Sequence, residues 1–201
     1  MSCAGRSKDV RKTGAAVMFK LTTPRLTIRP YTTEDFRAVH VYCSDPETVR
    51  YMTFGPNTEE ETMDFLAECE RHWKMYPVKR HECAIVLTQT GTVIGGIGLF
   101  VEQREGMLGW LLHPDYRRQG YMTEAAGEMM RYGFEDLNLH RQYATCFSDN
   151  IPSYSLMEKL GMRREGHYIK NRLIRNSAPD DWRDEYHYAI LQEEWKKYHA
   201  R

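Results

Sequence analysis

The chain has 201 residues, enough for one domain with a sizeable core. Its 28 Lys and Arg residues balance its 28 Asp and Glu residues, so net charge does not favour binding to nucleic acid or to a membrane surface. No run of about 18 apolar residues is present, so we expect no membrane-spanning helix.

The cysteines are odd in number and widely spaced, which does not fit a set of structural disulfides. None forms a Cys-x-x-Cys pair and no histidine cluster accompanies them, so no metal site is expected. Unpaired cysteines are typical of a reducing compartment, and we expect a cytoplasmic protein. The five are Cys3, Cys43, Cys69, Cys83 and Cys146.

The N-terminal stretch differs in character from the rest of the chain. Residues 1–17 are polar, basic and aperiodic, and they lack the apolar core of a signal peptide. We interpret them as a disordered leader or tag, with a functional basic arm as the alternative. Residues 18–201 are then expected to form a single domain.

The first half of the chain predicts a strand followed by helices. Residues 26–30 alternate between apolar and polar side chains, as a half-buried strand does. Thr32 with Asp35, and Thr58 with Glu61, have the spacing of caps that open helices. In the second helix one apolar stripe is expected to face the core, made of Met63, Leu66, Cys69 and Trp73.

The second half of the chain predicts mostly strands. A hairpin is expected around Thr90-Gly91, a helix from about residue 121, and a short helix over 153–160 that ends at Gly161. The remaining predicted strands are 82–88, 93–101, 107–112, 142–147, 162–169 and 185–191. This order predicts an α/β fold in which helices cover both faces of a mixed, mostly antiparallel, twisted sheet of six to seven strands.

The most informative segment follows the strand at 107–112. Arg117-Arg118-Gln119-Gly120 forms a basic, glycine-bearing loop that leads into the helix. Unpaired N–H groups and the dipole at a helix N-terminus favour an anion, and glycine lets the backbone approach a phosphate closely. We interpret the loop as a phosphate cradle. The alternative is an ordinary strand–turn–helix with a solvated basic turn.

Four segments together resemble the GCN5-related N-acetyltransferase superfamily, within it the RimJ/RimL-type branch. They are LTTPRLTIRPYTTEDF (21–36), LGWLLHPDYRRQGYMTEA (108–125), DNIPSYSLMEKLGMRREG (149–166) and DEYHYAILQEEW (184–195). The resemblance implies transfer of an acetyl group from acetyl-CoA, as co-substrate, to a primary amine. It covers nearly everything between Leu21 and Trp195.

The resemblance also implies a binding site for acetyl-CoA. The pyrophosphate would lie on the loop and on the start of the following helix. The pantetheine arm would lie along the end of the strand predicted at 107–112, and an asparagine just before the helix predicted at 153–160 would bind the pantetheine. The corresponding residues here are Trp110, Leu111, Leu112, Arg117, Arg118, Gln119, Gly120, Tyr121, Met122, Thr123, Asn150 and Ser153. The alternative for Asn150 is a turn or a helix cap.

The phosphate loop and the catalytic positions both depart from the superfamily pattern. Met122 stands where Gly or Ala is usual, and Met157 stands where many members carry a tyrosine acid. One turn before Met157 is Ser153, which the branch places as the candidate acid for the thiolate; the alternative is that Ser153 only caps the helix. Met107 stands where relatives often carry a glutamate base.

Two other residues are candidates for the base. Glu105 shares a strand face with Met107, and His113 ends the strand. We favour a turn charge for Glu105, because Arg104-Glu105-Gly106 has the composition of a turn. A site without a strong base favours an α-amine, of pKa about 7.7–8.0, over a lysine of about 10.4.

The expected acceptor is therefore an α-amine, and the resemblance to the RimJ/RimL-type branch implies a protein or peptide N-terminus of the ribosomal-protein type. The alternatives are a small amine, as in detoxification or antibiotic resistance, and a domain that binds acyl-CoA without catalysis. Nucleic acid and membrane are not expected as partners, and the protein is expected to be a monomer or homodimer.

Overall fold

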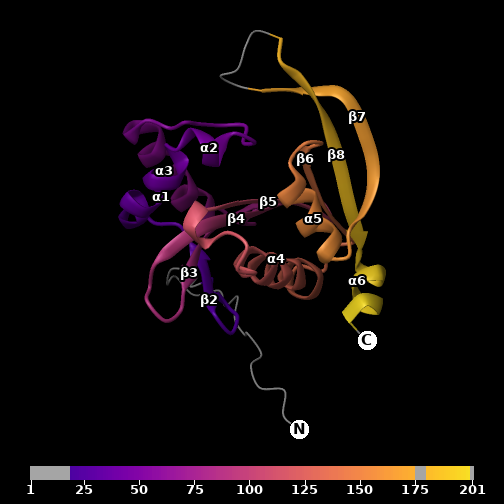
Figure 1. The fold of residues 1–201 in the computed structure, drawn as a ribbon. Coiled ribbons are helices and arrows are strands. Elements are labelled where there is room, and N and C mark those ends of the chain that lie inside the picture. The colour runs from indigo at the N-terminus through magenta and orange to yellow at the C-terminus, as the bar shows by residue number, and fades with distance from the viewer. Residues whose placement is uncertain (1–18, 175–179, 200–201) are drawn as a thin grey trace.

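A computed structural model describes residues 19–174 and 180–199, so the leader predicted at 1–17 lies outside the described residues. One sheet dominates the structure (Figure 1). Its eight strands are β1 (Leu21–Thr22), β2 (Leu26–Pro30), β3 (Arg80–Leu87), β4 (Val93–Glu102), β5 (Glu105–Leu112), β6 (Arg141–Phe147), β7 (Arg163–Leu173) and β8 (Trp182–Leu191).

The strands lie in the order β1-β2-β3-β4-β5-β6-β8-β7. Every neighbouring pair is antiparallel except β5 and β6, which run parallel. The predicted fold class is therefore confirmed, but the predicted count of six to seven strands is too low. The additional strand is β1, whose two residues are too short for an alternating pattern to reveal.

Helices cover both faces of the sheet (Figure 1). They are α1 (Phe36–Cys43), α2 (Pro46–Val49), α3 (Glu59–Trp73), α4 (Tyr121–Arg131), α5 (Ile151–Lys159) and α6 (Gln192–His199). The first three gather over one face, with α4 and α5 on the other. Helix α6, which follows β8 directly, was not predicted.

Each face has its own core. On the α4 side, Met129, Met130 and Met157 are buried against the sheet. On the other side, Leu66 and Cys69 of α3 are fully buried.

The predicted stripe of α3 is wrong at Met63, whose exposed fraction is 40%. Thr62 takes the inward position instead. Its hydroxyl lies 3.0 Å from Nδ1 of His40 and donates to the carbonyl of Thr58, so a polar residue is satisfied inside. An apolar pattern alone does not reveal such a position.

The predicted turn at residues 104–106 is also shifted. Glu102 and Glu105 are Cα partners across the β4–β5 hairpin, so the turn consists of Gln103 and Arg104, and Glu105 begins β5. Gln103 takes the left-handed conformation that closes a tight turn (φ 52°).

Within 19–174 and 180–199, no helix is long and apolar enough to cross a membrane. The same ranges contain no cluster of His, Cys, Asp and Glu suited to a metal ion. Cys43, Cys69, Cys83 and Cys146 are buried and free, whereas Cys3 lies outside the described residues.

Candidate active site

The loop between β5 and α4 approaches the helix through two left-handed residues. Arg118 has a φ of 61° and Gly120 a φ of 81°. Gly120 is the N-cap of α4, and no side chain of the described residues caps the helix by a hydrogen bond there. The amides of the first turn, at Tyr121, Met122 and Thr123, precede the first intrahelical hydrogen bond. The N-terminus of α4 is therefore open to an anion.

Two side chains of the loop fold back and fix its shape. The Arg117 guanidinium donates to the carbonyl of Leu112 and to the hydroxyl of Thr48 in α2, both at 3.1 Å. The amide of Gln119 donates to the carbonyl of Asp115 at 2.8 Å. Arg117 therefore ties the loop to the end of β5 and to α2, and Arg118 is an exposed cation two residues before Gly120.

The sheet divides next to this loop. β5 and β6 pair only through Glu105↔Arg141, Gly106↔Gln142 and Met107↔Tyr143. Beyond Met107, residues 108–112 pair with β4 on their other side. The predicted pantetheine residues, Trp110, Leu111 and Leu112, lie in this stretch, where the backbone edge that faced β6 can pair with an extended ligand.

Helix α5 begins on the C-terminal side of β6. Asn150 is its N-cap, and the Oδ1 atom accepts the Ser153 N–H at 3.3 Å. The capping interpretation of Asn150 is thus confirmed, and its side chain remains only partly buried.

Ser153 is the third helical residue, so its interpretation as the N-cap is wrong. Its hydroxyl lies against Cys146 of β6. Burial raises the pKa of the Cys146 thiol to about 11, while the hydrogen bond with Ser153 acts in the opposite direction. Ser153 therefore lies beside the part of β6 that has separated from β5.

The base candidates lie in different places. Met107 is half-buried at the last β5–β6 pair. His113 begins the loop, where its Nδ1 atom accepts the Asp115 N–H at 3.2 Å. Glu105 lies at the opposite end of β5, seven residues before Leu112, which is about 23 Å along an extended strand. The structure does not bring Glu105 to the loop or to Ser153.

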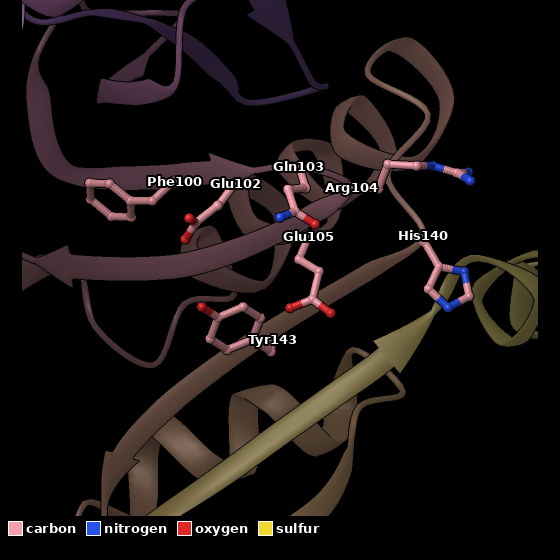
Figure 2. Close-up of a pocket in the computed structure, with 7 residues that line it drawn as sticks. All are labelled: Phe100, Glu102, Gln103, Arg104, Glu105, His140 and Tyr143. Carbon is pink, nitrogen blue, oxygen red and sulfur yellow. The ribbon is translucent and has the colours of Figure 1, made fainter.

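Glu105 instead lines a pocket of about 510 Å³ at the β4–β5 turn (Figure 2). Its carboxylate points toward Tyr143, while Arg104 and His140 point away. The side chain is 52% exposed and lies 3.8 Å from Arg141. This environment is that of a solvated surface charge.

Sequence reasoning missed two residues that contact the loop, Arg25 and Glu124. Arg25 precedes β2, and Glu124 lies in the first turn of α4, with its Oε2 atom 2.6 Å from Nε of Arg25. The sequence shows an acidic residue in a helix turn that is expected to bind an anion, but no local pattern identifies Arg25 as its partner.

The fold and the open helix N-terminus beside a divided sheet define an acyltransferase architecture. Residues 25–163 match the acetyltransferase (GNAT) domain family. The chain belongs to this family and is an N-acetyltransferase, and members of the family use acetyl-CoA.

Two curated relatives and one solved structure are similar to this chain. The chain is 39% identical to an uncharacterized N-acetyltransferase, YnaD, of Bacillus subtilis, over 87% of this chain and 98% of the relative. A GNAT-family acetyltransferase structure from Bacillus anthracis has a TM-score of 0.76 and 36% identity, covering 87% and 99% of the two chains. The spermidine N(1)-acetyltransferase of Escherichia coli is 27% identical, over 73% and 77%.

Proposed function

We propose that this N-acetyltransferase uses acetyl-CoA to acetylate the α-amino group of a protein or peptide N-terminus, as a member of the RimJ/RimL-like branch. The observation that carries the choice of acceptor is Met107. It occupies the last β5–β6 pair, and the resemblance to the superfamily implies that a glutamate base is common at this position. No strong base is therefore expected beside the reacting amine.

The residues fit the co-substrate. Gly120, exposed and left-handed, leaves the amides of residues 118–123 accessible to a pyrophosphate. The edge of residues 110–112 that β6 does not cover suits the amide groups of the pantetheine arm, with the Leu112 carbonyl already accepting from Arg117. The partly buried Asn150 lies on the β6 side of the division. Acetyl-CoA supplies an activated thioester, so holding the amine beside it can contribute roughly 7–11 kcal/mol.

In this proposal Ser153 protonates the departing thiolate. The Asn150 cap accepts the backbone N–H of Ser153 in the first turn of α5, and the Ser153 hydroxyl faces Cys146 in the part of β6 that has separated from β5. A backbone N–H near Leu111 or Leu112 polarises the thioester carbonyl. The chain thus supplies orientation, an acid and an oxyanion donor, but no strong base.

The acceptor must then lose its proton largely unaided. At pH 7 about a tenth of an α-amine is neutral, compared with about 0.04% of a lysine amine. Small amines of low pKa are the runner-up acceptors. A polyamine, the acceptor in the name of the E. coli relative, has strongly basic amines and is disfavoured by the same argument.

The test compares three acceptors with acetyl-CoA: a lysine-free peptide with a free N-terminus, an N-blocked peptide with one lysine, and spermidine. We expect kcat/KM to be highest for the free N-terminus and to rise with pH toward the pKa of its amine. Preference for spermidine would favour the small-amine alternative, and turnover of none, with CoA still bound, would favour a binding domain.

A matched variant tests the missing base. Met107→Glu is expected to raise activity near neutral pH, or to flatten the rise of kcat/KM with pH, because a carboxylate there would accept the proton. Glu105→Gln is the control and is expected to change little. If kcat/KM of the wild type falls on the acidic side with a pKa near 6, and Glu105→Gln or His113→Ala abolishes that fall, the chain has its own base.

A further inference from the structure

The turn between β1 and β2 contacts the first turn of α4, although about a hundred residues separate them. The carboxylate of Glu124 receives three hydrogen bonds from this turn. The Thr23 hydroxyl and the Arg25 N–H donate to Oε1, at 2.5 and 2.9 Å, and the Arg25 Nε–H donates to Oε2 at 2.6 Å. The Glu124 carboxylate thus links the turn between β1 and β2 to the N-terminus of α4.

The Arg25 guanidinium extends this link to both sides of Gly120. The Nη1 atom of Arg25 donates to the carbonyl of Gln119 at 3.0 Å, and the Cζ atom of the guanidinium lies 4.4 Å from the centre of the Tyr121 ring. A Cβ atom built on Gly120 would lie 3.4 Å from Nη2. Arg25 therefore contacts the residues before and after the left-handed glycine.

The negative charge of Glu124 is unfavourable next to a phosphate site, unless the contacts that this residue makes give it a second role. A carboxylate in the first helix turn stabilises the helix, but it also repels a bound phosphate. Burial alone would raise the pKa of the Glu124 carboxyl, yet the hydrogen bonds from Thr23 and Arg25 outweigh burial and lower it. The carboxylate is thus kept ionised, and the guanidinium lies between its charge and the solvent-exposed loop.

We propose that Arg25 and Glu124 form a clasp that holds the phosphate loop in its ligand-binding conformation. The inference rests on the proposed function, because it assigns the loop to the pyrophosphate of acetyl-CoA. Arg117 and Gln119 hold the start of the loop. Around the left-handed Gly120 the tie comes from Arg25, which contacts Gln119 and Tyr121 on either side. Without that tie, this part of the loop would have to be ordered when the ligand binds. A clasp formed before binding removes this ordering cost from the binding step. Arg25 and Glu124 are both positioning residues.

The direction in which Glu124→Ala changes the affinity for CoA distinguishes the clasp from a simple electrostatic effect of Glu124. If Glu124 acts only as a negative charge near the phosphates, Glu124→Ala must tighten CoA binding. If it acts through Arg25 on the loop, the same substitution must weaken binding. Alanine is the best helix former, so α4 itself is not weakened by the choice of residue.

The experiment measures Kd for CoA by calorimetry on Arg25→Ala, Glu124→Ala and the double variant. A hydrogen-bonded charged pair is worth enough that each single variant is expected to weaken binding about tenfold or more. The double variant is expected to bind about as weakly as either single one, because the two residues act as one unit. Arg164→Ala, which removes another arginine stacked on a tyrosine, is the control and should leave Kd unchanged.

A second readout distinguishes positioning from general damage to the fold. S-acetyl-pantetheine carries the thioester but no pyrophosphate, so its kcat/KM is expected to stay at the wild-type value in both variants, while KM for acetyl-CoA rises. An equal loss with both thioesters would show a merely structural role. Arg25→Lys keeps the charge but cannot span Gln119 and Glu124 together, and it replaces Arg25→Ala should that variant not fold.

The outcomes keep the two proposals apart. If wild-type protein fails to bind CoA, the proposed function is wrong. If the wild type binds CoA and either Glu124→Ala binds it more tightly or all variants bind it equally, the clasp is wrong and the proposed function stands.

Discussion

Gly120 allows the assignment of the phosphate loop to be tested with a control inside the same chain. The residue is left-handed, with a φ of 81°, and no heavy atom lies closer than the 3.4 Å of Arg25 Nη2 to the Cβ that a substitution would add. Gly91, in the β3–β4 turn, is also left-handed, with a φ of 72°, and its Cβ would have nothing within 4 Å. Gly120→Val and Gly91→Val therefore impose similar backbone strain, but only the first adds a side chain to the loop.

The expected magnitudes follow from this geometry. A side chain in the left-handed region costs about 1–2 kcal/mol, so each variant should lower Tm by roughly 2–8 °C while the fold remains intact. In Gly120→Val the side chain also keeps a phosphate from the amides of α4. Loss of the dipole interaction and of one charge-assisted hydrogen bond amounts to about 3 kcal/mol or more, at least about a hundredfold in Kd.

Calorimetric titration with CoA, paired with thermal melts, separates the two effects. Gly91→Val should bind CoA like the wild type, and Gly120→Val should bind at least a hundredfold more weakly at a similar Tm. Equal affinity in the two variants would refute the assignment of the loop, because the same strain would then be present without any obstruction of the ligand.

Two further predictions concern stability and chemistry. Burial lowers the pKa of His81 to about 4, so only the unfolded chain gains a proton as pH falls below about 6.5. The stability linked to neutral His81 is complete above that pH and declines toward pH 4. Urea unfolding measures the free energy of unfolding at pH 7 and at pH 4.5. Between these two pH values the wild type should lose about 2–3 kcal/mol more of this free energy than His81→Gln, and equal losses would contradict the prediction. Ser153→Ala should lower kcat by about 10²–10⁴-fold with little change in Tm or in KM for acetyl-CoA; an unchanged kcat would remove Ser153 as the acid.

The elements that sequence predicts well are those with a strong local signal. The Thr58–Glu61 capping box, with both hydrogen bonds formed, marks the start of α3, and alternating apolar residues mark the central strands. Asn150 and Ser153 are both candidates for the cap of α5 in the sequence, yet only the structure shows that Asn150 caps it. Local spacing does not distinguish an N-cap from the third helical residue when both are polar.

Residues that act across the fold are beyond such patterns. Arg25 and Glu124 are 99 positions apart, and no periodicity links them. Glu105 is a different case, because its distance from the loop is the length of β5 itself, and the sequence misses it only by taking residues 104–106 as a turn and not as the start of the strand. What the sequence could not provide is the placement of Ser153 beside β6, which depends on how α5 packs in the fold.

The short pairing of β5 with β6 has a consequence for how the molecule is held together. Strands β1 to β5 form a continuous antiparallel array, β6 to β8 form another, and within the sheet only three residue pairs join them. A ligand that lies between residues 108–112 and the free part of β6 would act as a bridging strand between the two arrays. Amide hydrogens on both sides of the division should then exchange more slowly together when CoA is bound, and the two arrays should unfold more cooperatively.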